Sequence, residues 1–342
     1  MAKKPTKAAT EEATRLQGYL DAIAKYEREF KKWETRVGAI LKRYRDEGRS
    51  ISSDSSESRF NILWSNVQIL VPATFARVPQ PDVARRFRDQ DPVGRVSALL
   101  MERGLEFETQ HYPDYRDTMR QCVQDRFLGG RGTAWIRYEP HFKTAPAPEA
   151  VEPEEGEQIT EDVEAAVPEE QLDYECAPVD YVSWKDFGHS VARTWEEVTL
   201  VWRRVYMSED AVTERFGEEI AKKIPYDSTP EDLKRADRNA QTDVKQQACV
   251  FELWDKEKGI AVWFSKSMKE FLDEKSDPLK LQHFFPTPKP LYATLTNETL
   301  VPVPDFVLYQ DQAKTLDTLA DRASGLVQML QVKGVYDAAA DS

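Results

Sequence analysis

The sequence has few cysteines, no long apolar run and no secretory leader, and each absence excludes a class of protein. The three cysteines, Cys122, Cys176 and Cys249, are odd in number and far apart, which argues against a disulfide-stabilised secreted fold. No stretch of about 18 apolar residues could cross a membrane as a helix. The N-terminus, MAKKPTKAATEEAT, contains lysines but lacks the apolar core of a signal peptide. These absences favour a soluble, intracellular chain with reduced cysteines.

Residues that carry catalytic chemistry are also scarce. The four histidines are scattered without the spacing of metal ligands, and no Ser, Cys and His triad can be assembled from spacing. The glycine-rich stretch FLGGRGTAW (127–135) lacks the lysine and the spacing of a phosphate-binding loop, and it follows a helix instead of a strand. We interpret it as a structural turn, and we predict no catalytic residue, no cofactor, no metal site and no enzymatic activity.

The negative charge of the chain is concentrated in one segment. The formal net charge is −13, but twelve acidic residues and no Lys or Arg lie between Glu149 and Glu175, so the remaining chain has a formal charge of −1. This segment has almost no large apolar residue, and burial could not compensate the entropy lost on ordering it. We expect a mobile acidic loop here. The net charge therefore neither supports nor excludes a nucleic-acid partner.

Apolar periodicity predicts an α+β fold. Large side chains at heptad spacing predict a long amphipathic helix over residues 13–45, and further helices are expected at 61–77, 91–111 and 114–128. Short β-rich runs begin at Pro178 and are interrupted by a helix near 208–216, with Ser208 as its N-cap. We divide the chain into five regions: an N-terminal long helix and polar connector (1–58), a mainly helical region (59–148), the acidic loop (149–177), a β-rich region (178–303) and a C-terminal helical region (304–342).

The last long element, predicted over Asp305–Val332, is a helix with an apolar seam. The seam residues alternate in steps of three and four: Phe306, Tyr309, Ala313, Leu316, Ala320, Ala323, Val327 and Leu330. The alanines permit close approach of other helices, and Leu319 and Leu326 add a second apolar row. This pattern favours packing among several neighbours over a two-stranded coiled coil. The other face carries a polar stripe that includes Lys314, Asp317 and Asp321.

Several stretches of the chain resemble the portal proteins of tailed bacteriophages, particularly those of short-tailed phages and related prophages. They are FNILWSNVQILVPATFARVPQPDVARRFRDQDPVGR (60–95), MRQCVQDRFLGGRGTAWIRYEP (119–140), DYVSWKDF (180–187), ARTWEEVTLVWRRVYMSEDAVTERFG (192–217) and FFPTPKPLYATLTNETLVPVPDFVLYQDQAKTLDTLADRASGLVQMLQVKGVYDA (284–338). They follow one another along the chain in the order found in the family. The resemblance implies wing structure over 1–148, β-rich wing and hip structure over 178–303, and a first stem helix that leads into the clip over 304–342. A family member would continue beyond residue 342, so the chain is expected to be truncated before the clip.

The resemblance also implies a function. Portal proteins form a ring of twelve identical subunits, a head-to-tail connector at one capsid vertex of the virion, through which the genome is packaged and ejected. The implied partners are other copies of the chain, the terminase motor, the major capsid protein and scaffold, the tail adaptor, and double-stranded DNA that passes without sequence-specific binding. Assembly would take place in the host cytoplasm. On this basis the eight seam residues are predicted to contact neighbouring subunits, and Lys314, Asp317 and Asp321 are predicted to face the channel.

The sequence leaves two alternatives to a portal protein open. Asp89 and Asp91 could act together as metal ligands beside the basic stretch 85–88, which would fit a metal-dependent enzyme that processes nucleic acid. A helix start at Asp91-Pro92 already explains one of these two carboxylates. A helical scaffold or adaptor protein without a channel is the second alternative.

Overall fold

The computed structural model describes residues 7–47, 60–85, 91–111, 113–144, 170–228, 246–268 and 270–330, and it confirms the expected α+β fold. Among these residues, no helix is both long enough and apolar enough to cross a membrane. The chain forms two compact units, each assembled from separate stretches. Unit 1 comprises Met1–Ala76, Met119–Ala134 and Tyr181–Ser342, and unit 2 comprises Arg77–Thr118 and Trp135–Asp180. Both units thus join segments that lie far apart in the sequence.

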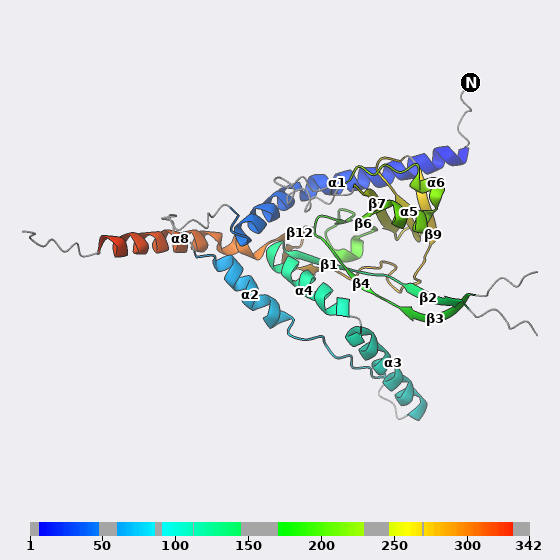
Figure 1. The fold of residues 1–342 in the computed structure, drawn as a ribbon, viewed down its shortest axis with the longest axis horizontal. Helices are drawn as coiled ribbons and strands as arrows, with labels where there is room; N and C mark the ends of the chain where they lie inside the picture. The colour runs from blue at the N-terminus through cyan, green and yellow to red at the C-terminus, as the bar shows by residue number, and fades with distance from the viewer. Residues whose placement is uncertain are drawn as a thin grey trace, which may run out of the picture. The chain divides into compact units, whose positions relative to one another are not determined.

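Unit 1 is organised around α1 (Lys7–Tyr44), which lies along a five-stranded antiparallel sheet (Figure 1). The sheet has the order β5 (Phe187–His189), β6 (Leu200–Met207), β7 (Ala248–Asp255), β8 (Ile260–Phe264) and β9 (Phe271–Ser276). The heptad residues of α1 are buried from Tyr19 to Val37, and they form the main core with Trp202, Phe251 and other residues of the sheet. The amphipathic helix predicted over 13–45 is confirmed, and its aromatic stripe faces the sheet.

One buried aspartate ties α1 to a hairpin of this sheet. β7 and β8 pair antiparallel, with Asp255 opposite Ile260 at the turn. Asp255 Oδ1 accepts hydrogen bonds from the backbone N–H groups of Glu257 and Lys258, at 3.1 and 3.2 Å, which fixes the turn. Its Oδ2 accepts a hydrogen bond from the Tyr19 hydroxyl of α1 at 2.9 Å. β7 and β8 therefore form a hairpin.

A second apolar cluster surrounds the end of α1. It joins Ile40 of α1 to buried residues of α2 (Ile62–Thr74) and α4 (Pro113–Leu128), and Phe306, Val307 and Tyr309 of α8 (Asp305–Met329) pack against it. Figure 1 shows α8 beginning near the point where α1 ends and α2 starts. The first turns of α8 are therefore held by three other helices of unit 1.

The glycine-rich stretch is a structural turn, as predicted. α4 ends at Leu128, and Gly130 has a φ of +85°, a conformation that favours glycine. β1 (Arg131–Ile136) follows, with Arg131 opposite Tyr292 of β10 (Leu291–Tyr292). A Cβ atom on Gly132 would lie 1.9 Å from the carbonyl oxygen of Cys122, so the strand can approach α4 only with glycine at this position.

Arg131 directly follows the turn, and its side chain is fully buried in the main core. Arg131 Nη2 donates hydrogen bonds to the carbonyl oxygens of Trp184 and Phe187, at 3.0 and 3.2 Å. The guanidinium carbon lies between 4.8 and 5.9 Å from the ring centroids of four aromatic side chains, those of Tyr26, Phe30, Trp33 and Phe187. Among the described residues, no carboxylate forms an ion pair with Arg131. The aromatic rings of α1 therefore stabilise a buried cation as well as filling space.

The remaining elements of unit 1 are short. They are the 3₁₀ helix η1 (Trp195–Glu197), α5 (Glu209–Phe216), α6 (Glu218–Ala221) and the hairpin β11 (Thr294–Thr296) and β12 (Thr299–Val303). The helix predicted near 208–216 is confirmed as α5, and the Ser208 hydroxyl accepts a hydrogen bond from the Ala211 N–H at 3.4 Å. β12 leads directly into α8.

Unit 2 contains α3 (Pro92–His111) and the antiparallel pair β2 (Glu139–Thr144) and β3 (Glu170–Cys176), while β4 (Val179–Val182) crosses from unit 2 into unit 1. β3 occupies part of the range 149–177 that was predicted as a mobile loop, so that prediction is wrong for residues 170–176. Leu172, Tyr174 and Cys176 alternate with polar residues there, which is the period of a strand. The strongly acidic composition of the segment conceals this short alternating pattern.

We expect Phe30→Ala to destabilise unit 1 by about 3–5 kcal/mol, since the substitution leaves a cavity in the main core. Phe30 is 1% exposed, stacks on Tyr26 and meets Trp33 edge-on. Urea unfolding followed by tryptophan fluorescence measures the loss. The control is Lys32→Ala on the exposed face of α1, which should change the free energy of unfolding by less than about 0.5 kcal/mol. Equal effects of the two substitutions would contradict the packing described here.

Stability should also fall in mild acid because of His189. This side chain is fully buried, and its burial, with the charge of Arg131, lowers its pKa to about 3. The unfolded chain therefore binds a proton that the folded chain excludes between about pH 6.5 and 3, and the free energy of unfolding falls by up to about 1.4 kcal/mol per pH unit as the pH decreases through that range. Above about pH 6.5 this histidine costs no stability.

The measurement is urea unfolding at a series of pH values, with the variant His189→Asn. His189 Nδ1 lies 2.9 Å from the Ser190 carbonyl oxygen and donates to it, and an asparagine amide can keep that donor without titrating. We expect the free energy of unfolding of the variant to depend less steeply on pH, by about one proton, than that of the wild-type chain. An unchanged slope in His189→Asn would refute the assignment.

Candidate functional site

The candidate functional site is the surface of α8, which carries the residues predicted to act at an interface or in a channel, apart from Leu330, which directly follows the helix. The helix begins after Pro304, and Asp305 in its first turn forms an ion pair with Arg126 of α4. Negative charge is favourable at that end of a helix. Phe306 and Tyr309 meet edge-on, with ring centroids 5.2 Å apart, and pack against the second apolar cluster. The helix is therefore anchored at its start by both charge and apolar contact.

The middle of α8 is also fixed within the chain. Ala313 is 3% exposed, and Leu316 is half-buried. Asp317 Oδ2 lies 2.6 Å from Arg43 Nη2 of α1, and Asp317 Oδ1 accepts a hydrogen bond from the Phe60 N–H at 3.3 Å. Both charged side chains are partly shielded from water, so this ion pair is stronger than one on an open surface. It attaches α8 to the end of α1 and to the start of the segment that leads into α2.

The second half of α8 has no comparable cover among the described residues. Ala320 is half-buried and Ala323 is exposed, while Val327 is 67% and Leu326 is 61% exposed. Leu319, Met329 and Leu330 are exposed as well. The heptad seam is thus continuous in sequence, but only its first half packs against other residues that the structure describes. A contiguous apolar surface of this kind is typical of a site that contacts another protein.

The predicted site residues therefore fall into two groups. Phe306, Tyr309, Ala313 and Leu316 contribute to packing within the chain, and Ala320, Ala323, Val327 and Leu330 lie on the exposed half of the seam. In the polar stripe, Lys314 and Asp321 are exposed, whereas Asp317 is engaged by Arg43, a contact that the sequence did not predict. The contacts with neighbouring subunits and the orientation toward a channel remain predictions.

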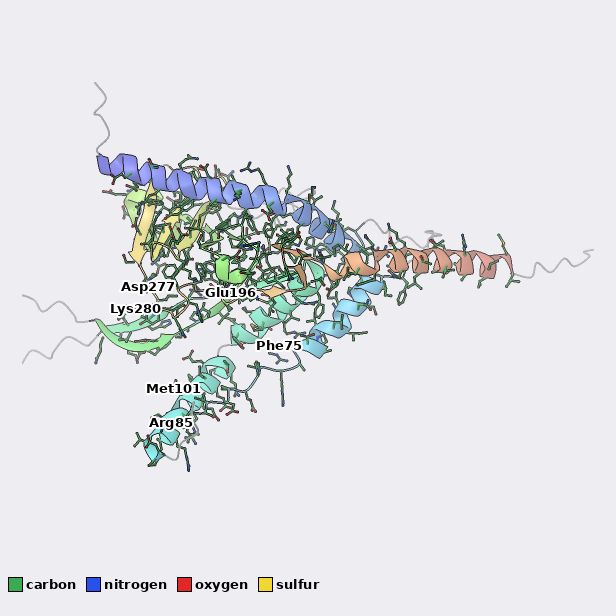
Figure 2. The ribbon with its side chains drawn as sticks, turned by 180° about the vertical axis from the view of Figure 1, so that it is seen from behind. Phe75, Arg85, Met101, Glu196, Asp277 and Lys280 are labelled. Atoms are coloured by element: carbon green, nitrogen blue, oxygen red, sulfur yellow. The ribbon has the colours of Figure 1, made fainter. Side chains whose placement is uncertain are left out.

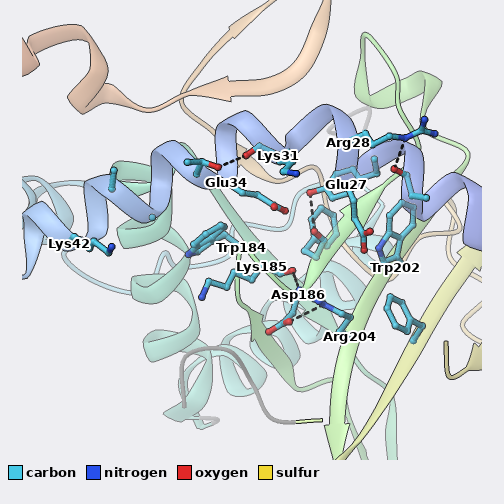
Figure 3. Close-up of a pocket in the computed structure, with 17 residues that line it drawn as sticks. Glu27, Arg28, Lys31, Glu34, Lys42, Trp184, Lys185, Asp186, Trp202 and Arg204 are labelled. Carbon is cyan, nitrogen blue, oxygen red and sulfur yellow. Dashed lines mark hydrogen bonds and ion pairs between the residues drawn. The ribbon is translucent and has the colours of Figure 1, made fainter. Parts of the chain in front are cut away.

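An open groove lies in unit 1 beside α1, with a volume of about 910 Å³. Figure 3 shows Trp184 and Trp202 in its wall, with charged side chains around them. Arg204 Nε pairs with Asp186 Oδ1 at 3.1 Å, and the Tyr26 hydroxyl donates to the Phe187 carbonyl oxygen at 3.1 Å. No histidine, cysteine or serine is among the residues that line the groove. Charged groups that line the groove pair with one another, as Arg204 does with Asp186.

The two aspartates considered as metal ligands can be assessed only in part. Asp89 lies outside the described residues. Asp91 Oδ1 accepts a hydrogen bond from the Val93 N–H at 3.1 Å, as expected of a residue at a helix start, and its Oδ2 lies 2.8 Å from Arg85 Nη1. Figure 2 labels Arg85 beside α3. Both oxygens of Asp91 thus have structural partners within unit 2, which weakens its case as a metal ligand.

Another group of possible metal ligands comes together in unit 2. Within the described part of the chain, Glu139, His141 and Cys176 place their ligand atoms within 4.8 Å of one another. The spacing of the histidines did not reveal this group, because only one of the three residues is a histidine and Cys176 lies on another strand. The available signal was the Glu-x-His pattern in a segment of alternating polarity, which puts the two side chains on one face of a strand.

Comparison with the known protein families and with curated proteins finds no match to this chain. Neither comparison therefore assigns it to a family.

Removing the Asp317 carboxylate should loosen α8 from α1. We expect Asp317→Ala to lower the free energy of unfolding by about 1–2 kcal/mol, because Arg43 and the Phe60 N–H lose their shared acceptor. Asp311→Ala, at an exposed position on the same helix, is the matched control and should cost less than about 0.5 kcal/mol. Thermal or urea unfolding gives both values. If the two variants are equally stable, Asp317 does not hold α8.

Proposed function

We propose that this chain is a subunit of a ring-shaped portal of the tailed-bacteriophage type, a connector through which a genome is packaged into and ejected from a capsid. The resemblance of the separate stretches between residues 60 and 338 suggests the class of protein. One structural observation carries the proposal. The apolar seam of α8 continues past the residues that pack inside the chain, so Leu326, Val327 and Leu330 are exposed. Other helices, supplied by neighbouring subunits, would cover them.

A closed ring of subunits would cover the exposed apolar rows of such a helix. If each α8 contacts one neighbour with one side and the other neighbour with its opposite side, a head-to-tail arrangement repeats until it closes. Each Leu or Val side chain that such contact buries fully stabilises the assembly by about 1.5–3 kcal/mol. The small side chains Ala320 and Ala323 on the same half of the seam would let the helices approach closely. The two apolar rows thus suit contact with more than one neighbour.

Other helices support the assignment to an assembly. In unit 1, α2 exposes Trp64, Ile69 and Leu70. In unit 2, α3 has no buried residue, and it exposes a row of apolar side chains that includes Val96, Leu100 and Met101, the last of them labelled in Figure 2. Large exposed apolar patches are uncommon on proteins that act as monomers. A chain with three such helices is better suited to act inside a larger particle.

The proposed mechanism is geometric and electrostatic, with no covalent step. A ring of packed helices would form a stiff channel, and we predict that Lys314 and Asp321, which are exposed, lie near its lumen, with Asp317 beside them where it pairs with Arg43. A lumen of mixed charge would hold DNA phosphates weakly, because tight binding requires many cationic contacts that displace counterions. DNA could then slide through while the packaging motor drives it. The other proposed partners, the terminase motor, the capsid and scaffold proteins and the tail adaptor, follow from the resemblance alone.

A charge placed on the seam should disturb assembly. Ala320→Glu would put a carboxylate where α8 is proposed to meet a neighbouring helix, and we expect native mass spectrometry of the full-length protein to show mostly monomers or incomplete rings. Gln312→Glu adds the same charge at an exposed position off the seam, and it should leave assembly unchanged. Complete rings formed by Ala320→Glu would overturn the proposed interface.

Images of the full-length protein separate the proposal from its two alternatives. Negative-stain images that show rings with a central hole support a portal, and assemblies without a hole would favour a scaffold or adaptor. The enzyme alternative would replace the proposal if the protein bound Mg²⁺ or Mn²⁺ by calorimetry and had a nuclease activity that Asp89→Ala abolished. A clean monomer in all these measurements would contradict the portal assignment.

A further inference from the structure

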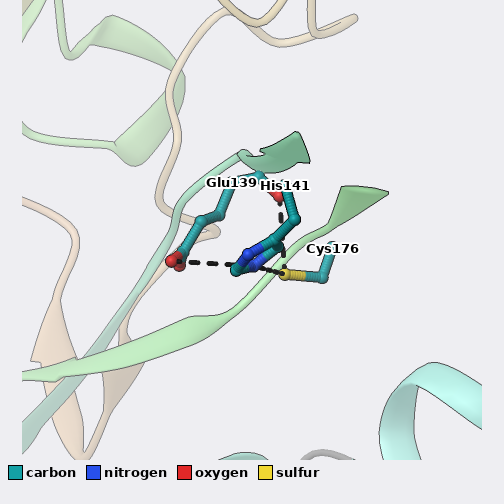
Figure 4. Close-up of side chains that lie close together, drawn as sticks. All are labelled: Glu139, His141 and Cys176. Carbon is teal, nitrogen blue, oxygen red and sulfur yellow. Dashed lines mark hydrogen bonds and ion pairs between the residues drawn. The ribbon is translucent and has the colours of Figure 1, made fainter. Parts of the chain in front are cut away.

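The pairing of β2 and β3 in unit 2 brings three metal-binding side chains to one face of a strand pair. Glu139 and His141 are two residues apart on β2, and alternate residues of a strand point to the same face. Cys176 on β3 lies directly opposite Glu139 in the register, and Tyr174 lies opposite His141. Side chains of directly opposite residues share a face, so Cys176 joins the other two. Figure 4 shows the three side chains converging from the two strands.

The separations of the donor atoms fit a metal ion. Cys176 Sγ lies 3.7 Å from His141 Nε2, and His141 Nε2 lies 3.8 Å from Glu139 Oε1. In a tetrahedral zinc site, bonds of about 2.3 Å to sulfur and about 2.0 Å to nitrogen separate the two donors by about 3.5 Å. All three ligand atoms lie within 4.8 Å of one another, so small side-chain rotations suffice to reach that geometry.

The surroundings hold the donors in place and leave a path for an ion. Tyr174 stacks on His141 with ring centroids 4.1 Å apart and an angle of 15° between the planes, which fixes the imidazole. Arg137 Nη1 lies 3.5 Å from Glu139 Oε2, on the other carboxylate oxygen from the one that faces His141. Cys176 is 7% exposed, whereas the side chains of His141 and Glu139 are 38% and 43% exposed. The sulfur is thus sheltered, and the opposite side of the site is open to solvent.

We propose that Glu139, His141 and Cys176 form a binding site for a divalent transition-metal ion of the zinc class. A thiolate, an imidazole and a carboxylate are the donors that such borderline ions prefer, whereas Mg²⁺ and Ca²⁺ require mostly oxygen donors. Binding transfers the Cys176 thiol proton to solvent, so the sulfur binds as a thiolate. Water or another ligand completes the fourth position on the open side. The site does not depend on the portal assignment.

The bound ion would link β2 to β3. A pair of strands has little independent stability in water, because one face of so small a sheet buries few side chains. An ion held by Glu139 and His141 on one strand and Cys176 on the other connects them through side chains as well as through backbone hydrogen bonds. We expect metal binding to order this pair and to protect the Cys176 thiol from alkylation.

Cobalt binding tests the proposal, because a Co²⁺–thiolate bond has a characteristic ultraviolet charge-transfer absorption. Titration of the full chain with Co²⁺ should produce this band at one ion per chain, and Zn²⁺ should displace it. The band should disappear in Cys176→Ser. In His141→Ala and Glu139→Gln, calorimetry should show Zn²⁺ affinity reduced by more than about 100-fold, since even partners outside the first coordination shell change affinity by roughly 10–100-fold.

Matched variants elsewhere in the chain serve as controls. Cys249→Ser and His283→Ala remove a thiol and an imidazole outside the site, and both should leave the band and the affinity unchanged. If Cys176→Ser does not fold by circular dichroism, the exposed positions His141 and Glu139 still decide the result. The proposal is overturned if the wild-type chain shows no thiolate band with Co²⁺. It is also overturned if His141→Ala and Glu139→Gln bind Zn²⁺ as tightly as the wild-type chain does.

Discussion

The burial of one aromatic stripe on α1 is the interaction on which the rest of unit 1 depends. Tyr26, Phe30 and Trp33 fill the main core against the sheet β5–β9, and the end of the same helix contributes Ile40 to the cluster that holds α2, α4 and the start of α8. One rigid helix therefore links a sheet to a helical cluster. Because Arg43 on its last turn also pairs with Asp317, the direction of α8 relative to α1 is fixed within this unit by packing and by charge together.

Arg131 connects the glycine turn to the aromatic core around α1. A buried cation without a paired carboxylate would be costly in a purely aliphatic core, since it loses its hydration. Here the rings of α1 face the guanidinium, and the carbonyl groups of Trp184 and Phe187 accept its hydrogen bonds. The same rings surround His189, which stays neutral in a site that disfavours a second charge. The aromatic content of α1 thus has an electrostatic role in addition to its apolar one.

The two proposed binding surfaces, the exposed half of α8 and the group on β2 and β3, differ in their physical character. The exposed half of α8 is a long apolar stripe, which helices of neighbouring subunits are proposed to cover. The group on β2 and β3 is small and polar, and its three donors would bind an ion without any partner chain. Because one surface belongs to unit 1 and the other to unit 2, each can be altered by substitution without a change in the other's residues. An assembly role and a metal-stabilised strand pair are therefore compatible in one chain.

Local patterns in the sequence determined the helices and their ends. The heptad over 13–45, the cap at Ser208 and the glycines after Leu128 each act on neighbouring residues, through side-chain period, capping and backbone freedom, and the structure confirms all three. The α8 seam was also visible, but only tertiary packing decided that its first half is buried and its second half exposed, because that boundary lies where α1, α2 and α4 cease to cover it. Tertiary structure likewise decided the contact between Asp317 and Arg43, and the meeting of Cys176 with Glu139 and His141. These contacts join residues distant in sequence, and strand register and helix packing, which depend on the whole fold, set the distances between them.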